Sequence, residues 1–256
     1  MELAESSFIS GFLDDVRAAR TLFLRPQRLT LPMVALFAII PFYLVIGAFV
    51  AHGHTYRPET RLDALFPLVP AWSLVYLSLF LAALLPVFVV HQQELVRRVV
   101  WMYLTTWLTA FAVFLLYPTA APVHADVLGG GFTDAVMRGL YDSDVSYNCF
   151  PSLHVAQCYL AASCCHKVHR RTGMVAFAWA TLVSLSTLYT KQHYVADVVG
   201  GMALAFTVSH LFLRGYPREA TPAAERRLAP ALALGAFAVY GLGVSSLWIA
   251  YLVTKP

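Results

Sequence analysis

Two short segments of the sequence contain the residue types that acid–base and nucleophilic chemistry requires. The first is Pro151-Ser152-Leu153-His154, and the second runs from Lys191-Gln192-His193 to Asp197. His193 and Asp197 are spaced i, i+4, so on a helix they share a face and their side chains can hydrogen-bond. A carboxylate bound to one imidazole nitrogen fixes the tautomer and makes the other nitrogen more basic. The spacing therefore favours His193 as a nucleophile or general base that Asp197 orients.

The first segment adds an acid and a place for an anion. His154 opens an apolar run just after Pro151, and proline is favoured near helix starts. The unpaired N–H groups of such a helix start can hold an anion together with the Ser152 hydroxyl, and Lys191 adds a positive charge. Two histidines, an anion site and a cation suggest phosphoryl transfer, in which one histidine attacks phosphorus and the other protonates the leaving oxygen.

Each of these groups also has a purely structural interpretation. His154 taken alone is more often an interfacial histidine at a membrane edge than a catalytic one. The His193–Asp197 pair alone can equally cap a helix or bridge two spans. The four cysteines show no metal-binding spacing, and three of them lie within one apolar run, where cysteine usually acts as a small hydrophobic residue. No metal-binding motif appears in the sequence, so we expect neither a metal nor another cofactor.

The composition predicts that most of the chain lies in a membrane. Hydrophobic residues make up 59% of the 256 positions and charged residues 12%, with a mean hydropathy of +0.65. A soluble domain carries about 25% charged residues. The expected fold is therefore all-α, a polytopic transmembrane helical bundle forming one integral-membrane domain over residues 1–256. Apolar runs near the length of a spanning helix are Leu31–Val50, Ala71–Val90, Val99–Leu116, Leu153–Cys165 (the weakest), Met174–Leu188, Val195–Leu213 and Ala229–Val253.

Basic residues predict the orientation of this bundle. Most of the 18 Lys and Arg residues precede the first apolar run or lie between the second and third, between the fourth and fifth, and after the sixth. The positive-inside rule then places the N-terminus in the cytoplasm and both chemical segments on the outer face. Residues 1–28 are predicted to form a cytoplasmic amphipathic segment. We expect a plasma (inner) membrane protein whose active site faces the outside or periplasm. Nucleic-acid binding is not expected, because membrane topology accounts for the basic loops.

The two segments together resemble the type-2 phosphatidic acid phosphatase superfamily. Phe150-Pro151-Ser152-Leu153-His154 is similar to the family motif P-S-x-H, and Ser186-x6-His193-x3-Asp197, followed by Gly200-Gly201, is similar to S-R-x5-H-x3-D. The resemblance covers roughly Leu62–Leu213. It implies a six-helix phosphatase-type catalytic core at residues 62–213, with residues 229–253 as an additional seventh span.

The resemblance also implies roles for individual residues. His193 would form a phosphohistidine, Asp197 would orient it, and His154 would protonate the leaving alcohol. The family motif K-x6-R-P would end near Tyr117-Pro118, but Tyr117 replaces its arginine, Ala110 its lysine, and Thr187 the arginine of the S-R pair. Lys191 is the nearest substitute for these missing cations. The residues expected to bind the substrate phosphate are Ser152, Lys191, Tyr117 and Ser186, with Arg57 and Arg138 as further candidates.

The departures from the motif favour one branch of the family. Residues 117–122 and Lys191-Gln192-His193-Tyr194 look more like the inositolphosphotransferase branch, which is similar to inositol phosphorylceramide and sphingomyelin synthases. A diester phosphate carries one negative charge, so fewer cations suffice to bind it. We therefore expect headgroup transfer between lipids, with hydrolysis of a lipid phosphate (phosphatidate or isoprenyl phosphate) as the alternative.

The expected partners are a lipid phosphate or phospholipid substrate and membrane lipids, while the oligomeric state is not predicted. A proton-coupled transporter is the alternative from another class of protein, and a non-catalytic membrane protein that kept the fold is a third, because the family's cations are substituted. A transporter would place its ionisable groups near the bilayer midplane, whereas the histidines here lie at the ends of apolar runs.

Overall fold

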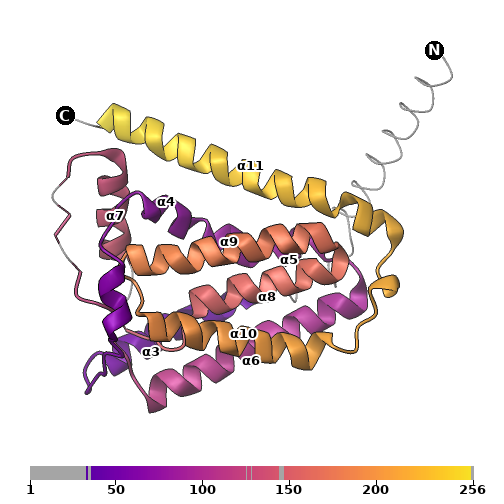
Figure 1. Ribbon diagram of the computed structural model, residues 1–256, viewed down its shortest axis with the longest axis horizontal. Helices are drawn as coiled ribbons and strands as arrows, with labels where there is room; N and C mark the ends of the chain where they lie inside the picture. The colour runs from indigo at the N-terminus through magenta and orange to yellow at the C-terminus, as the bar shows by residue number, and fades with distance from the viewer. Residues whose placement is uncertain (1–32, 34–35, 125, 128, 144–146, 255–256) are drawn as a thin grey trace.

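The computed structural model describes residues 33, 36–124, 126–127, 129–143 and 147–254, and within these ranges the regular elements are all helices. The predicted all-α bundle is therefore confirmed (Figure 1). The predicted amphipathic segment, residues 1–28, lies outside the described residues. In chain order the elements are η1 (Leu36–Ile39), α3 (Ile40–Val50), η2 (Arg61–Leu65), α4 (Trp72–Leu77), α5 (Leu79–Val89), α6 (Gln93–Leu116), α7 (Phe132–Ser143), α8 (Leu153–Val168), α9 (Arg170–Tyr189), α10 (Val195–Leu213), η3 (Arg218–Ala220) and α11 (Ala223–Thr254).

Five helical stretches are long and apolar enough to cross a membrane. They are Trp72–Val89, which comprises α4 and α5, together with α6, α9, α10 and α11. The two remaining predicted runs correspond to shorter helices, α3 with 11 residues and α8 with 16. The chain is therefore an integral membrane protein, and each predicted apolar run overlaps a helix.

The start of α6 differs from the expectation from sequence. The apolar run begins at Val99, but the helix begins at Gln93, so Arg97 and Arg98 lie within the helix and not in a loop. Gln92 caps the helix by accepting a hydrogen bond from the Leu95 N–H at 2.7 Å. Glu94 accepts a bond from Arg98 at 2.9 Å and also pairs with Arg97. These i, i+3 and i, i+4 ion pairs allow a charged first turn to remain helical.

The short helix α8 lies at the centre of the bundle. It packs against α9, α10, α5 and α6, and Figure 1 shows it between α9 and α10. Its buried face carries small residues, among them Ala156, Ala161 and Cys165, and small residues let neighbouring helices approach closely. Because neighbouring helices cover most of α8, its 16 residues do not need to match the full thickness of a bilayer.

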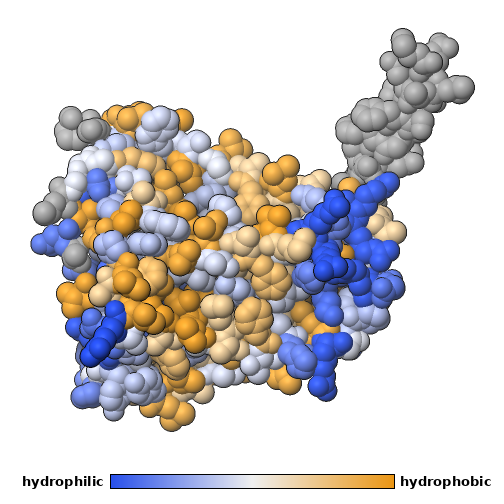
Figure 2. Space-filling view, in the orientation of Figure 1, coloured by the Kyte–Doolittle hydropathy of each residue, from blue (hydrophilic) through white to orange (hydrophobic). Residues whose placement is uncertain are grey.

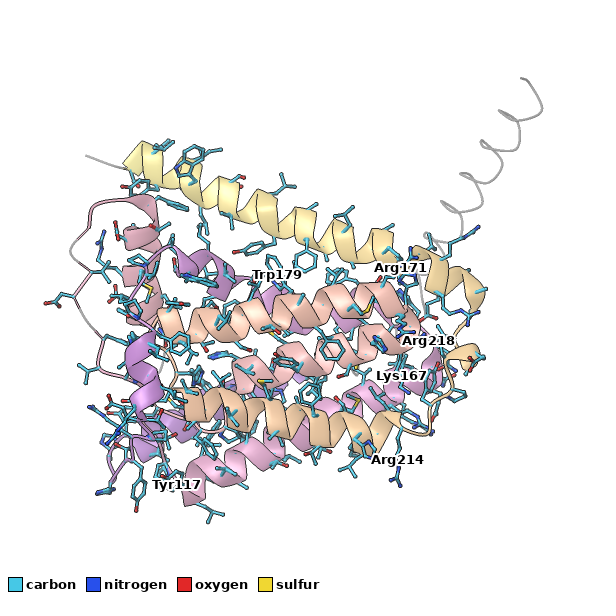
Figure 3. The ribbon with its side chains drawn as sticks, in the orientation of Figure 1. Tyr117, Lys167, Arg171, Trp179, Arg214 and Arg218 are labelled. Carbon is cyan, nitrogen blue, oxygen red and sulfur yellow. The ribbon has the colours of Figure 1, made fainter. Side chains whose placement is uncertain are left out.

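The two chemical segments meet at one end of the bundle. α8 runs away from His154, α9 returns, and α10 runs away again from Asp197. Figure 3 shows Lys167, Arg171, Arg214 and Arg218 at the far end of these helices and Tyr117 at the opposite end. The space-filling view has its strongest hydrophilic patch at that far end, and hydrophobic residues spread along the helices (Figure 2). We call the end with these cations the basic end and the other the histidine end.

Candidate active site

His193 lies in the tight turn that joins α9 to α10. Lys191 adopts the left-handed region with φ 55°, and the N–H groups of Gln192 and His193 both donate to the Thr187 carbonyl, at 2.9 and 3.2 Å. The turn therefore holds His193 by its backbone, two residues before α10 begins. This corrects one expectation, since His193 and Asp197 do not lie on one face of a helix. They meet because Asp197 folds back over the N-terminus of α10.

The N-terminus of α10 is held by two carboxylates. Asp197 Oδ2 accepts a hydrogen bond from the Tyr194 N–H at 2.9 Å, and Asp63 Oδ1 accepts one from the Val195 N–H at 2.7 Å. Negative charge is favourable at this end of a helix, where backbone donors are unpaired. Asp63 was not singled out as a site residue from the sequence, because the contact joins positions 132 residues apart. Its function in this structure is to position α10.

The two histidines and Asp197 form a hydrogen-bonded series. His193 Nδ1 lies 3.3 Å from Asp197 Oδ2, and His193 Nε2 lies 3.1 Å from His154 Nδ1. Asp197 is fully buried and His193 nearly so. A carboxylate only accepts hydrogen bonds, so His193 carries its proton on Nδ1 and directs the Nε2 lone pair towards His154. The spacing in the sequence predicted the pairing of His193 with Asp197. The geometry suits a reaction in which His193 is the nucleophile and His154 the adjacent acid.

Tyr76 joins this series from α4. Its hydroxyl lies 3.4 Å from His154 Nδ1, and the two rings meet edge to face with centroids 5.5 Å apart. Tyr76 is 1% exposed, and a buried tyrosine hydroxyl usually needs a polar partner. A tyrosine within an apolar helix was the only signal available in the sequence, and it does not distinguish a site residue from a membrane-interface residue.

Ser152 connects the two segments of the site. Its side-chain oxygen caps α8 by accepting from the Val155 N–H at 3.3 Å, and its own N–H donates to the Asp197 carbonyl at 3.0 Å. The hydroxyl is buried and its acceptor role is used within the fold. Ser152 therefore stands at the helix start that was predicted to bind phosphate, and in the described state it acts as the N-cap.

The adjacent glycines allow α10 to reach this segment. A Cβ on Gly201 would lie 2.5 Å from the Ser152 carbonyl oxygen, and one on Gly200 would lie 2.7 Å from the Phe150 ring. Both distances are shorter than real Cβ contacts, so only glycine fits. The Phe150 N–H also donates to the Thr119 hydroxyl at 2.8 Å. The loop after α6 is thus fastened to the segment that carries His154.

The predicted phosphate-binding residues differ in their position. Ser186 is buried within α9, and its hydroxyl donates to the Val183 carbonyl at 2.6 Å. Tyr117 is 41% exposed. Its ring stacks on that of Tyr56, with centroids 4.7 Å apart, and meets the Phe150 ring edge to face. The described contacts do not bring either side chain to the histidines. Their phosphate-binding role remains a prediction.

Lys191 lies beside the histidines, in a polar cavity. This cavity has a volume of about 350 Å³, and His193 is also in its wall. Lys191 Nζ donates to the Asp63 carbonyl at 3.4 Å, which leaves further donors for an anion. Arg57, Glu59 and Tyr194 line the same cavity. Burial raises the pKa of Tyr194, Glu59 raises it further and Arg57 lowers it, so the phenol stays protonated as a donor at neutral pH.

Two apolar cavities have His154 in their walls. One, of about 240 Å³, lies between α3, α5, α6 and α8 and includes Phe80 and Gln157 in its wall. The other, of about 310 Å³, lies between α4, α7 and α11 and includes Tyr76, Gly139 and again Phe80. His154 thus stands where two apolar cavities meet, and its partner His193 faces the polar one.

Cys149 also lies close to the acidic end of the series. Its sulfur and the ligand atoms of His193 and Asp197 lie within 4.8 Å of one another, a spacing that a metal ion could bridge. The facing atoms of His193 and Asp197 are already hydrogen-bonded to each other. A metal bound there would compete with the hydrogen bond between His193 and Asp197. None of the four cysteines forms a disulfide, and all four are buried.

Comparison with known proteins supports the assignment by sequence. The chain is 24% identical over 125 residues to a PA-phosphatase related-family protein of Dictyostelium discoideum, covering 44% of this chain and 22% of that protein. It is 31% identical over 99 residues to the inositol phosphorylceramide synthase of Candida albicans, covering 36% of this chain and 21% of that protein. The chain thus aligns with about a fifth of the length of these relatives. No solved structure matches it. The model of the PAP2 superfamily matches residues 60–211, more than half of the chain and including every residue of the histidine series, so the chain belongs to the PAP2 superfamily.

Proposed function

We propose that this protein transfers a phosphate-bearing headgroup from one membrane lipid to another through a phosphohistidine on His193. The observation that carries the proposal is the Asp197–His193–His154 series, placed where two apolar cavities and one polar cavity meet. The similarity to an inositol phosphorylceramide synthase supports transfer over simple hydrolysis. The positive-inside rule supports an outward-facing site, since the cations gather at the basic end.

In the first step, His193 Nε2 attacks phosphorus and a P–N bond forms. The bond from phosphorus to the oxygen of the leaving lipid alcohol breaks, and His154 gives that oxygen a proton. The phosphorylated imidazole still carries its Nδ1 proton and is therefore cationic. Asp197 stabilises this cation through the 3.3 Å contact between its Oδ2 and His193 Nδ1. The other carboxylate oxygen, Oδ1, is buried and has no hydrogen-bond partner among the described residues, so no other group there neutralises the negative charge of Asp197.

In the second step, the acceptor's hydroxyl attacks the same phosphorus. His154, now neutral, takes the hydroxyl proton as the new P–O bond forms and the P–N bond breaks. His193 is regenerated with its Nε2 lone pair free. His154 therefore serves both steps, as the acid for one lipid and the base for the next, so both lipids must reach it. This requirement matches its place at the meeting point of two apolar cavities.

The described state is closed to substrate. The 3.1 Å between His154 and His193 is a hydrogen-bond distance and leaves no room for phosphorus between the two nitrogens. Phosphate binding must therefore turn His154 away from His193. Tyr76 lies 3.4 Å from the same nitrogen of His154, so it supplies an alternative partner for that ring as it moves.

The polar cavity supplies the groups that would bind the headgroup. Lys191 and Arg57 provide two cations where the family arginines are replaced. Two cations suffice for the single charge of a phosphodiester, and the charge of Glu59 disfavours a doubly charged monoester. Glu59 and the Tyr194 phenol are also suited to hydrogen-bond the hydroxyls of a polyol headgroup.

The test uses purified full-length protein in detergent micelles. A diester phospholipid with ceramide or diacylglycerol, and separately a monoester lipid, are incubated with the wild type, His193→Ala, Asp197→Asn and His52→Ala. We expect a new headgroup-bearing lipid from the wild type, complete loss in His193→Ala, and a drop of about 10²–10⁴-fold in Asp197→Asn. His52 is an exposed histidine of the loop after α3, so its substitution is the control and leaves activity unchanged.

Two outcomes would contradict parts of the proposal. Transfer activity that persists in His193→Ala would exclude the phosphohistidine mechanism. Release of inorganic phosphate without a headgroup-bearing product shows a phosphatase. The same assay in EDTA tests the expected metal independence, and a loss of activity that added divalent cation restores would overturn it.

A further inference from the structure

A groove at the basic end of the bundle lies far from the histidines. It has a volume of about 710 Å³ and lies over the C-terminal half of α8, between α9 and α10. These two helices each pack against α8 (Figure 1), and the groove lies over the last turns of α8, from Ser163 to Lys167. None of the residues assigned to the active site lines it.

The upper part of the groove is positively charged. Lys167 and Arg214 line it, and Arg218 lies beside it, donating to the carbonyls of His166 and Lys167. Figure 3 shows these three cations together at the basic end. None of the three has a carboxylate partner among the described residues, and no acidic residue lines the groove. The charge at this end is therefore available to an anion.

The lower part of the groove is apolar and aromatic. The rings of Phe177 from α9 and Phe206 from α10 stack across it, with centroids 6.3 Å apart and an interplanar angle of 20°. Leu211 adds an exposed aliphatic side chain. A free anion such as inorganic phosphate gains nothing from contact with this apolar surface. An acyl chain lying in the groove would cover it and remove it from water.

The wall also contains polar atoms without a partner. Ser209 is 8% exposed and lines the groove, and its hydroxyl makes no hydrogen bond with any described residue. The same is true of His166 Nδ1. Unpaired buried polar atoms cost free energy unless a ligand or water satisfies them. A headgroup next to the cations would supply such partners once these side chains turn towards the groove.

We propose that this groove binds one anionic glycerophospholipid of the surrounding membrane, with its phosphate at Lys167 and Arg214 and an acyl chain over Phe177 and Phe206. The charge complementarity and the apolar floor together select this occupant. A zwitterionic lipid would gain binding free energy only from the apolar part of the groove, and a soluble anion only from the cations. The site lies at the opposite end of α8 from His154, so the bound lipid is not the substrate.

Lipid selectivity measured by native mass spectrometry tests this site. Full-length protein is reconstituted in nanodiscs with equal amounts of phosphatidylglycerol and phosphatidylcholine, and the lipid that stays bound after release is identified. We expect the wild type to retain one lipid molecule and to prefer phosphatidylglycerol over phosphatidylcholine about tenfold. The double variant Lys167→Gln/Arg214→Gln should bring the two lipids to near parity, because each cation near an anionic lipid contributes to binding.

The control variant removes the same charge from the same end. Arg170 and Arg171 are exposed and do not line the groove, so Arg170→Gln/Arg171→Gln should keep the preference. A third variant, Thr207→Trp, fills the groove from an exposed position of α10 and should lower retention of both lipids.

Several results would overturn the proposal. The first is equal retention of the two lipids by the wild type, and the second is a loss of the phosphatidylglycerol preference in Arg170→Gln/Arg171→Gln as large as in the double variant. The others are displacement of the bound lipid by inorganic phosphate and unchanged lipid retention in Thr207→Trp. The last variant decides the question even where the double variant fails to fold.

Discussion

At the level of single residues, the site depends on His193 using both ring nitrogens at once. Nδ1 faces Asp197 and Nε2 faces His154, so in the proposed reaction one carboxylate fixes which nitrogen attacks phosphorus. Asp197 does this while also accepting from the Tyr194 N–H. One fully buried carboxylate therefore sets both the tautomer of His193 and the start of α10. A change at Asp197 should alter the chemistry first and the fold second, since an asparagine oxygen can still accept the Tyr194 N–H.

Lys191 offers the most direct test of how the missing family cations are replaced. Lys191→Gln removes a charge from the polar cavity and keeps a side chain of similar length. We expect KM for an anionic lipid substrate to rise about tenfold with a smaller change in kcat, because a lost charge-assisted hydrogen bond costs about 1.5–3 kcal/mol. Kinetics at low and moderate salt measure this.

The matched control is Arg61→Gln, an exposed cation at the histidine end that does not line the cavity. It should leave KM unchanged. An equal rise in KM for both variants would mean that only the general charge of the surface matters, and it would exclude Lys191 from the site.

At the level of helices, the geometry depends on how closely α10 approaches α8. A Cβ at Gly201 would collide with the Ser152 carbonyl, and one at Gly200 would collide with the Phe150 ring. The Ser152 N–H donates to the Asp197 carbonyl across the same contact. The pair of glycines therefore lets two helix starts, each carrying one histidine beside it, come within hydrogen-bonding reach. Glycine here serves close approach, since neither residue has a positive φ.

Gly201→Ala should separate these helix starts. The added Cβ would lie 2.5 Å from backbone oxygen, which cannot move as a side chain can, so we expect a destabilisation of about 1–3 kcal/mol. We also expect a loss of transfer activity larger than this destabilisation explains, because the His154–His193 distance changes. Thermal unfolding and kcat, measured on the same preparations, give the two effects.

Gly235→Ala is the control within α11, where a Cβ meets nothing within 4 Å. It should be neutral or slightly stabilising, since alanine is the better helix former. Normal activity in Gly201→Ala would show that the α8–α10 contact does not set the histidine geometry.

At the level of the whole molecule, the sequence predicted which segments meet but not how they are held. Apolar runs and the charges beside them predicted that His154 and Asp197 lie at the same end of the bundle. The i, i+4 spacing predicted the pairing of His193 with Asp197, although His193 lies in the turn before α10 and not on the helix. The contacts of Asp63 and Tyr76 could not be predicted, because they join distant positions through tertiary packing. The buried position of Ser186 could not be predicted either, since its rotation within α9 depends on the helices around it.

The arrangement of cavities gives the last prediction, which concerns the acceptor lipid. The cavity between α4, α7 and α11 has His154 in its wall, as expected for a lipid whose hydroxyl gives its proton to that histidine while its oxygen attacks phosphorus. Gly139 lies in its wall, and a Cβ there meets nothing within 4 Å, so Gly139→Leu adds a side chain at the wall of this cavity from a position with room for its first carbon. We expect transfer to a lipid acceptor to fall at least tenfold. Formation of the phosphohistidine, measured by quenching with a headgroup-labelled donor, should continue at the wild-type rate.

The control, Gly241→Leu, adds the same side chain to an exposed position of α11 where a Cβ also meets nothing. Both steps should continue there. If Gly139→Leu slowed both steps equally, the cavity would hold a second chain of the donor lipid. If it slowed neither, the acceptor would reach His154 from elsewhere, and the bundle would have one lipid entrance on the side of α3, α5 and α6. Only a selective loss of the second step supports two lipids meeting at one histidine, because His154 must exchange its proton with each of them in turn.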